Sequence, residues 1–260
     1  MHKHALRAGA TILLALGFLR IVDSQTPRPA FEVASIKENT GAAGPPIWVP
    51  QRSGDRVTLR KVRLDVVINY AWHIDNLYEI SFTASMPDTW YDIEAKSDGV
   101  PDDNRLRLMF QTLLEERCKL KTHFETREIA LYNLVVSKAG KLKASDPGAT
   151  VMVEKVPMRP RTASIMFGGD TEHFAGKEAS AAQIIDSLSR NLRAPVRDMT
   201  GLTGTYDFDV AFAREDDSLN GSLTASLQEA IQRELGLKLE NSKGPVKVLV
   251  VDHVEKPTPN

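Results

Sequence analysis

The stretch TWYDIEA at residues 89–95 returns, with conservative changes, as GTYDFDV at residues 204–210. Three further pairs follow the same order at a spacing of roughly 115 to 117 residues. They are VI at 67–68 with II at 184–185, LEERCKLK at 114–121 with IQRELGLK at 231–238, and LVV at 134–136 with LVV at 249–251. Four matches in order favour an internal duplication over chance, so the sequence predicts two related units.

Each unit shows the same succession of periodicities. Residues 56–62, 80–83 and 90–96 alternate as strands, and residues 63–73 and the segment from Asp102 have helical apolar spacing. In the second unit, 173–176, 196–199 and 206–212 are expected strands, and helices are expected from Ser180 and Ser222. Two hairpins are expected to close the units, 120–128 with 131–137 and 237–241 with 246–254.

The fold class expected is therefore α+β, with two tandem β-α-β-β-α-β-β units. Each unit is expected to be a small, mostly antiparallel sheet with two helices on one face. Residues 31–37 add a leading strand, and residues 144–162 form the linker between the units. We divide the chain into a signal peptide at 1–24, a first unit at 25–145 and a second unit at 146–260. The two units are expected to pack across a shared face or a continuous sheet.

The first residues have the order of a secretory signal. Lys3 and Arg7 precede an apolar run at 8–19, and Val22 and Ser24 are small residues before a cut at Gln25. The alternative is an uncleaved anchor, although the run is short for a bilayer crossing of roughly 20 residues. We expect a secreted or periplasmic protein with no stable membrane insertion after cleavage.

Charge and cysteine content exclude some classes of function. The chain has 33 Lys and Arg against 34 Asp and Glu, so it lacks the basic footprint of a nucleic-acid-binding protein. Cys118 is the single cysteine, so no intramolecular disulfide forms. It aligns with Leu235 of the second unit, which favours a buried, inert thiol over a nucleophile assisted by His123.

No catalytic or metal-binding motif stands out, and we predict no cofactor. A Gly-x-Ser-x-Gly elbow and a His-Glu-x-x-His helix are both absent. Asp92 and Asp207 are candidate ligand contacts because they recur, but a solvated face or a bond to nearby backbone explains them as well. Trp72 and Tyr78 are candidate binding residues among the aromatics of the first unit, although aromatic side chains more often pack in a core.

Four phrases together resemble a family of uncharacterised exported proteins that is abundant in soil bacteria of the acidobacterial type. They are FEVASIK at 31–37, YDI at 91–93, TGLTGTYDF at 200–208, and LGLKL at 235–239 with VVD at 250–252. The resemblance brings no activity or catalytic residue with it. Similar domains are fused to membrane zinc peptidases of the beta-lactam-sensor type, which implies a sensing or interaction role outside the cytoplasm.

The leading hypothesis is an exported, non-enzymatic binding or interaction module of the cell envelope, with an envelope protein or a small ligand as partner. One alternative is an extracytoplasmic hydrolase or metal-dependent enzyme with a site assembled between the units. Another alternative is a small-molecule sensor domain that binds its ligand near Trp72 and Tyr78.

Overall fold

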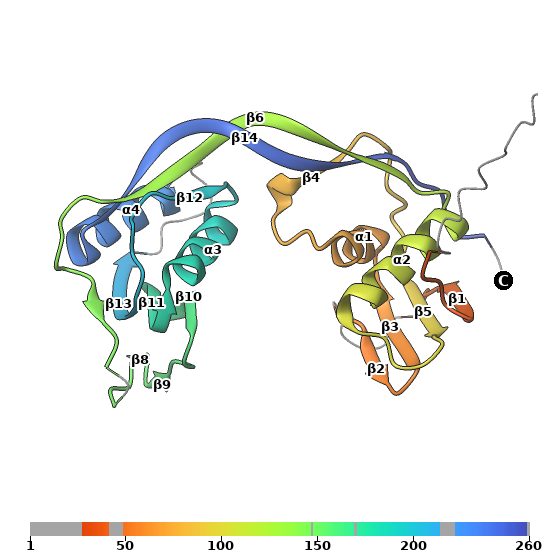
Figure 1. Ribbon diagram of the computed structural model, residues 1–260, viewed down its shortest axis with the longest axis horizontal. Helices are drawn as coiled ribbons and strands as arrows, with labels where there is room; N and C mark the ends of the chain where they lie inside the picture. Colours follow the sequence, from red (N-terminus) through yellow and green to blue (C-terminus); the bar gives the residue numbers. More distant parts are fainter. Residues whose placement is uncertain (1–27, 42–48, 147, 169–170, 214–221, 259–260) are drawn as a thin grey trace, which may run out of the picture.

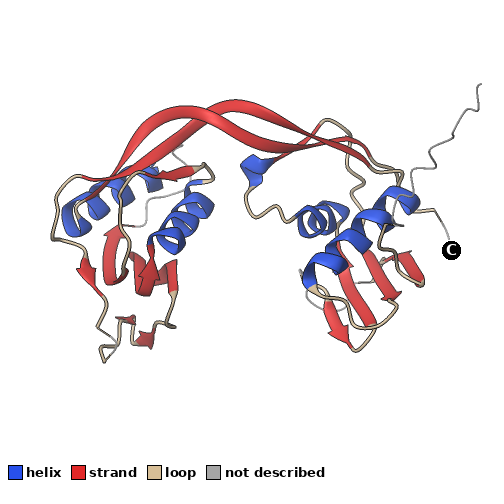
Figure 2. Cartoon of the chain, viewed as in Figure 1, coloured by secondary structure: helices blue, strands red, loops and turns tan. Residues whose placement is uncertain are grey.

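The α+β class is confirmed by the computed structural model, which describes residues 28–41, 49–146, 148–168, 171–213 and 222–258. The expected leader lies outside the described residues. Within them, four α-helices accompany three four-stranded sheets and one small hairpin. The elements form two lobes connected by a long, arched β-ribbon (Figure 1, Figure 2).

The first lobe is an antiparallel sheet with two helices on one face. The sheet has the order β1 (Val33–Glu38), β5 (Tyr91–Lys96), β3 (Arg56–Val62) and β2 (Gln51–Ser53), and the helices are α1 (Leu64–Trp72) and α2 (Asp103–Arg117). Asp102 caps α2 by accepting a hydrogen bond from the amide of Arg105 at 2.7 Å. Apolar side chains from both layers, Leu59 and Phe110 among them, are fully buried in one core.

The second lobe repeats this order. Its sheet runs β7 (Lys143–Ala144), β13 (Thr205–Ala213), β11 (Thr171–Ser180) and β10 (Thr162–Gly168), and its helices are α3 (Ala181–Leu192) and α4 (Ser222–Leu235). Ser180 begins α3 with a capping box to Gln183, as the sequence predicts. A hairpin of β8 (Met152–Val153) and β9 (Val156–Pro157) lies within the connection from β7 to β10.

The prediction of two closing hairpins is wrong, because each is one continuous strand. β6 (Lys121–Val136) and β14 (Leu237–His253) pair antiparallel along their whole length, from Leu237 opposite Val136 to His253 opposite Lys121. At about 3.3 Å per residue, the 16 residues of β6 span roughly 50 Å. Each strand satisfies its backbone with the distant strand, so neither needs the tight turn that its local sequence indicates.

The ribbon also forms a third sheet and takes part in both cores. β12 (Val196–Asp198) pairs parallel with β6, and β4 (Ile80–Phe82) pairs parallel with β14. Leu249 near the end of β14 belongs to the first core, and Leu134 near the end of β6 belongs to the second. The strand that follows the helices of one lobe therefore ends in the core of the other, and one continuous sheet connects the lobes. No helix in the described part of the chain is long and apolar enough to cross a membrane.

Candidate functional site

Asp92 and Asp207 each hold a β-bulge in their own lobe. The register of β3 against β5 shifts between Leu59 and Val62, and that of β11 against β13 shifts between Gly176 and Ala179. The bulges contain Lys61 at φ 49° and Glu178 at φ 48°, both left-handed. Asp92 Oδ1 accepts the Lys61 amide at 2.8 Å, and Asp207 Oδ1 accepts the Glu178 amide at 2.7 Å. The repeated aspartate thus bonds backbone that would otherwise lose its ladder partner.

The remaining contacts of the two carboxylates also correspond. Asn39 Nδ2 donates to Asp92 at 2.9 Å, and Ser145 Oγ donates to Asp207 at 2.8 Å. Each aspartate also forms an ion pair with a cationic side chain of its own lobe. Arg60 lies 3.4 Å from Asp92 with 47% of its side chain exposed, whereas Lys177 lies 2.9 Å from Asp207 with 5% exposed. Both aspartates therefore bond groups of their own lobe, in separate sheets.

Hydrogen bonds lower the pKa of both carboxyls. Burial alone would raise the pKa of Asp207, but the amide of Glu178, the ammonium of Lys177 and the hydroxyl of Ser145 outweigh it and lower the pKa to about 2. The pKa of Asp92 is also lowered, since Asn39 and the Lys61 amide overcome a similar desolvation.

The low pKa of Asp207 predicts a loss of stability in acid. Its folded pKa of about 2 lies below the ordinary value of 3.8, so its contribution is complete above about pH 3.8 and falls away as the pH drops towards 2. The difference corresponds to about 2 kcal/mol. We expect urea unfolding measured from pH 5 to 2 to show this loss, and Asp207→Asn to flatten it. Equal slopes for the two proteins would contradict the assignment.

The histidines of the described residues do not converge on a common site. Each pairs with a nearby carboxylate: His73 with Asp75, His123 with Asp252, His173 with Asp209 and Glu154, and His253 with Glu255. Among the residues that the structure describes, no group of three or more His, Cys, Asp or Glu could hold a metal ion.

Cys118 follows α2 and is fully buried in the first core, as Leu235 is buried in the second. Burial raises the pKa of the thiol to about 12, so almost no thiolate forms at neutral pH. We expect a disulfide reagent such as DTNB to leave the folded protein unlabelled and to label one thiol per chain in denaturant. Rapid labelling of the folded protein would contradict this inert role.

A hollow of about 400 Å³ lies between the lobes, and it is the candidate binding site. One wall is the short 3-10 helix η1 (Leu77–Glu79) and its preceding residue, and the other consists of α3 and β12. The lining residues are Asn76 and Tyr78 from the first lobe, and Ala182, Ile185, Asp186, Ser189, Val196 and Asp198 from the second. Residues of both lobes therefore form the hollow.

Tyr78 is the sequence candidate that lines this hollow. Burial raises the pKa of its hydroxyl, partly offset by a hydrogen bond with Ser189 of the other lobe. Trp72 is half-buried and packs against the first core instead. Apolar spacing in the sequence includes Ile185 in the buried side of α3, and nothing in the sequence marks Ser189 as a contact. Helical spacing gives no sign that this end of the helix would meet a tyrosine from another lobe.

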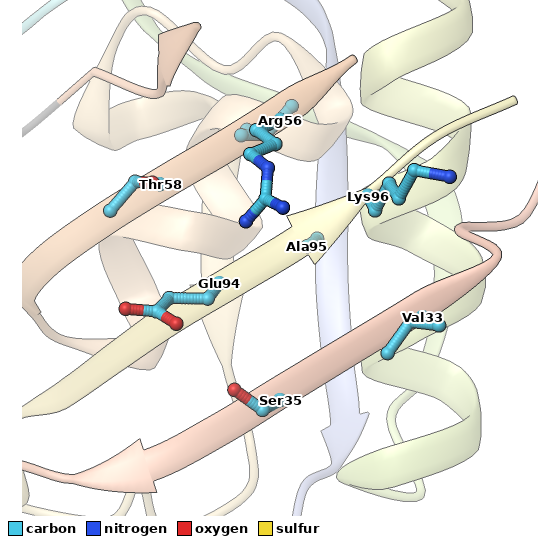
Figure 3. Close-up of a pocket in the computed structure, with 8 residues that line it drawn as sticks. Val33, Ser35, Arg56, Thr58, Glu94, Ala95 and Lys96 are labelled. Carbon is cyan, nitrogen blue, oxygen red and sulfur yellow. The ribbon is translucent and has the colours of Figure 1, made fainter. Parts of the chain in front are cut away.

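A second hollow, of about 410 Å³, lies on the outer face of the first sheet, opposite its helices (Figure 3). Side chains of β1, β3 and β5 line it, including Val33, Ser35, Arg56, Thr58 and Glu94. The alternation of β5 places Glu94 and Lys96 on this face and Ile93 in the core, as the sequence predicts. This alternation shows only which side chains share a face of the sheet. It does not predict that the face contains a hollow.

Two helix-covered sheets, a shared ribbon and a hollow between the lobes define a two-lobed α+β protein. The chain belongs to the family described as protein of unknown function (DUF3738), whose model matches residues 65–254. The resemblance to an uncharacterised family is thereby confirmed, while the soil association and the peptidase fusions stay predictions. Comparison with curated proteins and with solved structures found no match.

Proposed function

We propose that the protein is an exported, non-enzymatic binding module of the cell envelope that holds a small ligand between its lobes. The observation that supports ligand binding is the hollow itself, to which both lobes contribute residues. Its volume of about 400 Å³ falls in the range of small-molecule sites, roughly 300 to 1,000 Å³. A ligand there would contact both lobes at once.

The lining indicates the chemistry of the ligand. Ala182, Ile185 and Val196 form an apolar wall, and Tyr78 adds an aromatic ring. Asp198 also lines the hollow and accepts both the amide and the hydroxyl of Thr200, at 2.8 and 2.7 Å. The combination favours a ligand with an apolar body and hydrogen-bond donors, since the carboxylates present acceptors only.

Ligand binding is tested by thermal-shift screening of the mature protein against a library of soil-derived small molecules. We expect at least one compound to raise the Tm of the wild type and to have little effect on Ile185→Trp, in which the new ring fills the hollow. Leu108→Trp, on the exposed side of α2, is the matched control and should respond like the wild type. Compounds that stabilise all three proteins equally would contradict the assignment.

Export is tested separately by fractionation of the native host and by sequencing the N-terminus of the recovered protein. We expect the protein outside the cytoplasm with Gln25 as its first residue. A full-length cytoplasmic protein would contradict export without bearing on the hollow.

A further inference from the structure

The sheets of the two lobes correspond residue by residue. Their orders, β1-β5-β3-β2 and β7-β13-β11-β10, match, and so do their bulges. When residues are counted back from the bulge along each strand, Thr58 corresponds to Ala175. Their partners on the neighbouring strand, Glu94 and Asp209, correspond as well. Two residues before these positions, Arg56 of β3 corresponds to His173 of β11. Both lie on the face of their sheet that points away from the helices.

In the second lobe, the chain itself covers this outer face. The connection from β7 to β10, which contains the β8–β9 hairpin, buries Val153 to 4% exposure. Ala175 on the face is fully buried. Lys177 is 5% exposed there, against 47% for Arg60 at the corresponding place in the first lobe. Among the described residues, therefore, the chain covers the outer face of the second sheet and leaves that of the first sheet exposed.

The hairpin places a carboxylate against this face. Glu154 at its tip lies 3.3 Å from Nε2 of His173, whose Nδ1 lies 2.8 Å from Asp209. Glu154 and Lys155 have φ of 46° and 66°, a conformation that costs a non-glycine residue about 1 kcal/mol or more. This conformation occurs at the residue whose carboxylate lies beside the imidazole of His173.

In the first lobe the corresponding cation has no such partner. Among the described residues, no carboxylate lies within ion-pair distance of Arg56, whose side chain reaches from β3 over β5 in the hollow (Figure 3). Ser35 and Thr58 also line this hollow and add hydroxyls to it. The connection from β1 to β2 contains no Asp or Glu from Thr40 to Pro50, so its sequence offers no counterpart of Glu154.

We propose that the outer face of the first sheet is a docking site for an acidic extended segment of a partner protein. A carboxylate of that segment pairs with Arg56 as Glu154 meets His173 in the second lobe. Guanidinium is the better group for this contact, because it is always charged and binds carboxylates through two hydrogen bonds. The site is separate from the hollow between the lobes and does not depend on the function proposed for it.

The test uses a random-peptide phage library panned against the full mature protein. We expect the enriched peptides to share Asp or Glu, and the synthetic peptides to bind Arg56→Gln about tenfold more weakly or worse, as expected for loss of a charged hydrogen bond. Replacing the shared acidic residue by its amide should weaken binding to the wild type similarly, and should add little further loss with Arg56→Gln.

Arg105→Gln is the matched control, because Arg105 is exposed in the first turn of α2, away from the hollow. It should bind the peptides like the wild type, and thermal unfolding should show that both variants are folded. Peptides without acidic residues, no enriched peptides, or equal losses for both variants would overturn the proposal. Self-association of the wild type that disappears in Arg56→Gln would also overturn it, by assigning the face to a second copy of the chain.

Discussion

Asp207→Ala is expected to lower the free energy of unfolding by about 3 kcal/mol or more. The carboxylate accepts hydrogen bonds from Ser145, from the amides of Asp146 and Glu178, and from Lys177. Without it, the left-handed bulge loses its amide acceptor. The buried ammonium keeps the carbonyl of Asp146, at 2.6 Å, and a long ion pair of 3.9 Å with Glu178. Removing one partner of a buried ion pair typically costs about 3 to 5 kcal/mol. Urea unfolding at pH 7, followed by circular dichroism, measures the change.

Asp92→Ala is the matched control, because it removes the same bulge contact beside an exposed cation. Arg60 keeps its ion pair with Glu94 there. We therefore expect a loss of about 1 to 2 kcal/mol, from the hydrogen bonds that Asp92 accepts from the Lys61 amide and from Asn39. The double variant Asp207→Ala with Lys177→Met should recover part of the loss, since it removes the buried charge as well. Equal costs at the two aspartates, or no recovery, would show that burial of Lys177 is not the cause.

Local features of this fold were predictable from the sequence. Apolar spacing placed the four helices, and Ser180 and Asp102 were recognisable as caps because capping needs only neighbouring residues. The repeated Tyr-Asp pair pointed to equivalent strands, and a bond from Asp to nearby backbone was one of the interpretations left open. All of these depend on interactions within a few residues of the signal.

The parts that could not be predicted depend on partners far apart in the chain. Segment 241–246, with its Gly and Pro, has the composition of a turn, yet Gly244 and Pro245 pair with Ile129 and Glu128 in the ribbon. The hollow between the lobes depends on the same pairing, since the ribbon brings Tyr78 to α3. Arg56 and His173 are residues of different types, so only the register of the strands shows that they correspond.

Gly236→Ala is expected to cost about 3 kcal/mol or more, the second large effect. Gly236 ends α4 with φ of 66°, and its carbonyl accepts the amides of Ser137 and Lys138 at 2.8 and 3.0 Å. A Cβ at this position would lie 2.1 Å from the carbonyl oxygen of Lys138. Because the obstacle is backbone, no side-chain rotation relieves it, and the start of β14 must move away from the end of β6. Overpacking of this kind adds about 1 to 3 kcal/mol to the left-handed penalty of about 1 to 2.

The first lobe separates these two contributions. Lys119 stands at the position equivalent to Gly236 and has a φ of 52°, so a side chain is tolerated there in the left-handed conformation. Glycine is therefore required at 236 by the approach of Lys138 rather than by φ alone. Gly201→Ala is the experimental control, since Gly201 has φ of 69° and a Cβ added there would meet nothing within 4 Å, so it should cost only about 1 to 2 kcal/mol. If chemical denaturation gave the same loss for both glycines, the close approach of β6 and β14 at Gly236 would be refuted.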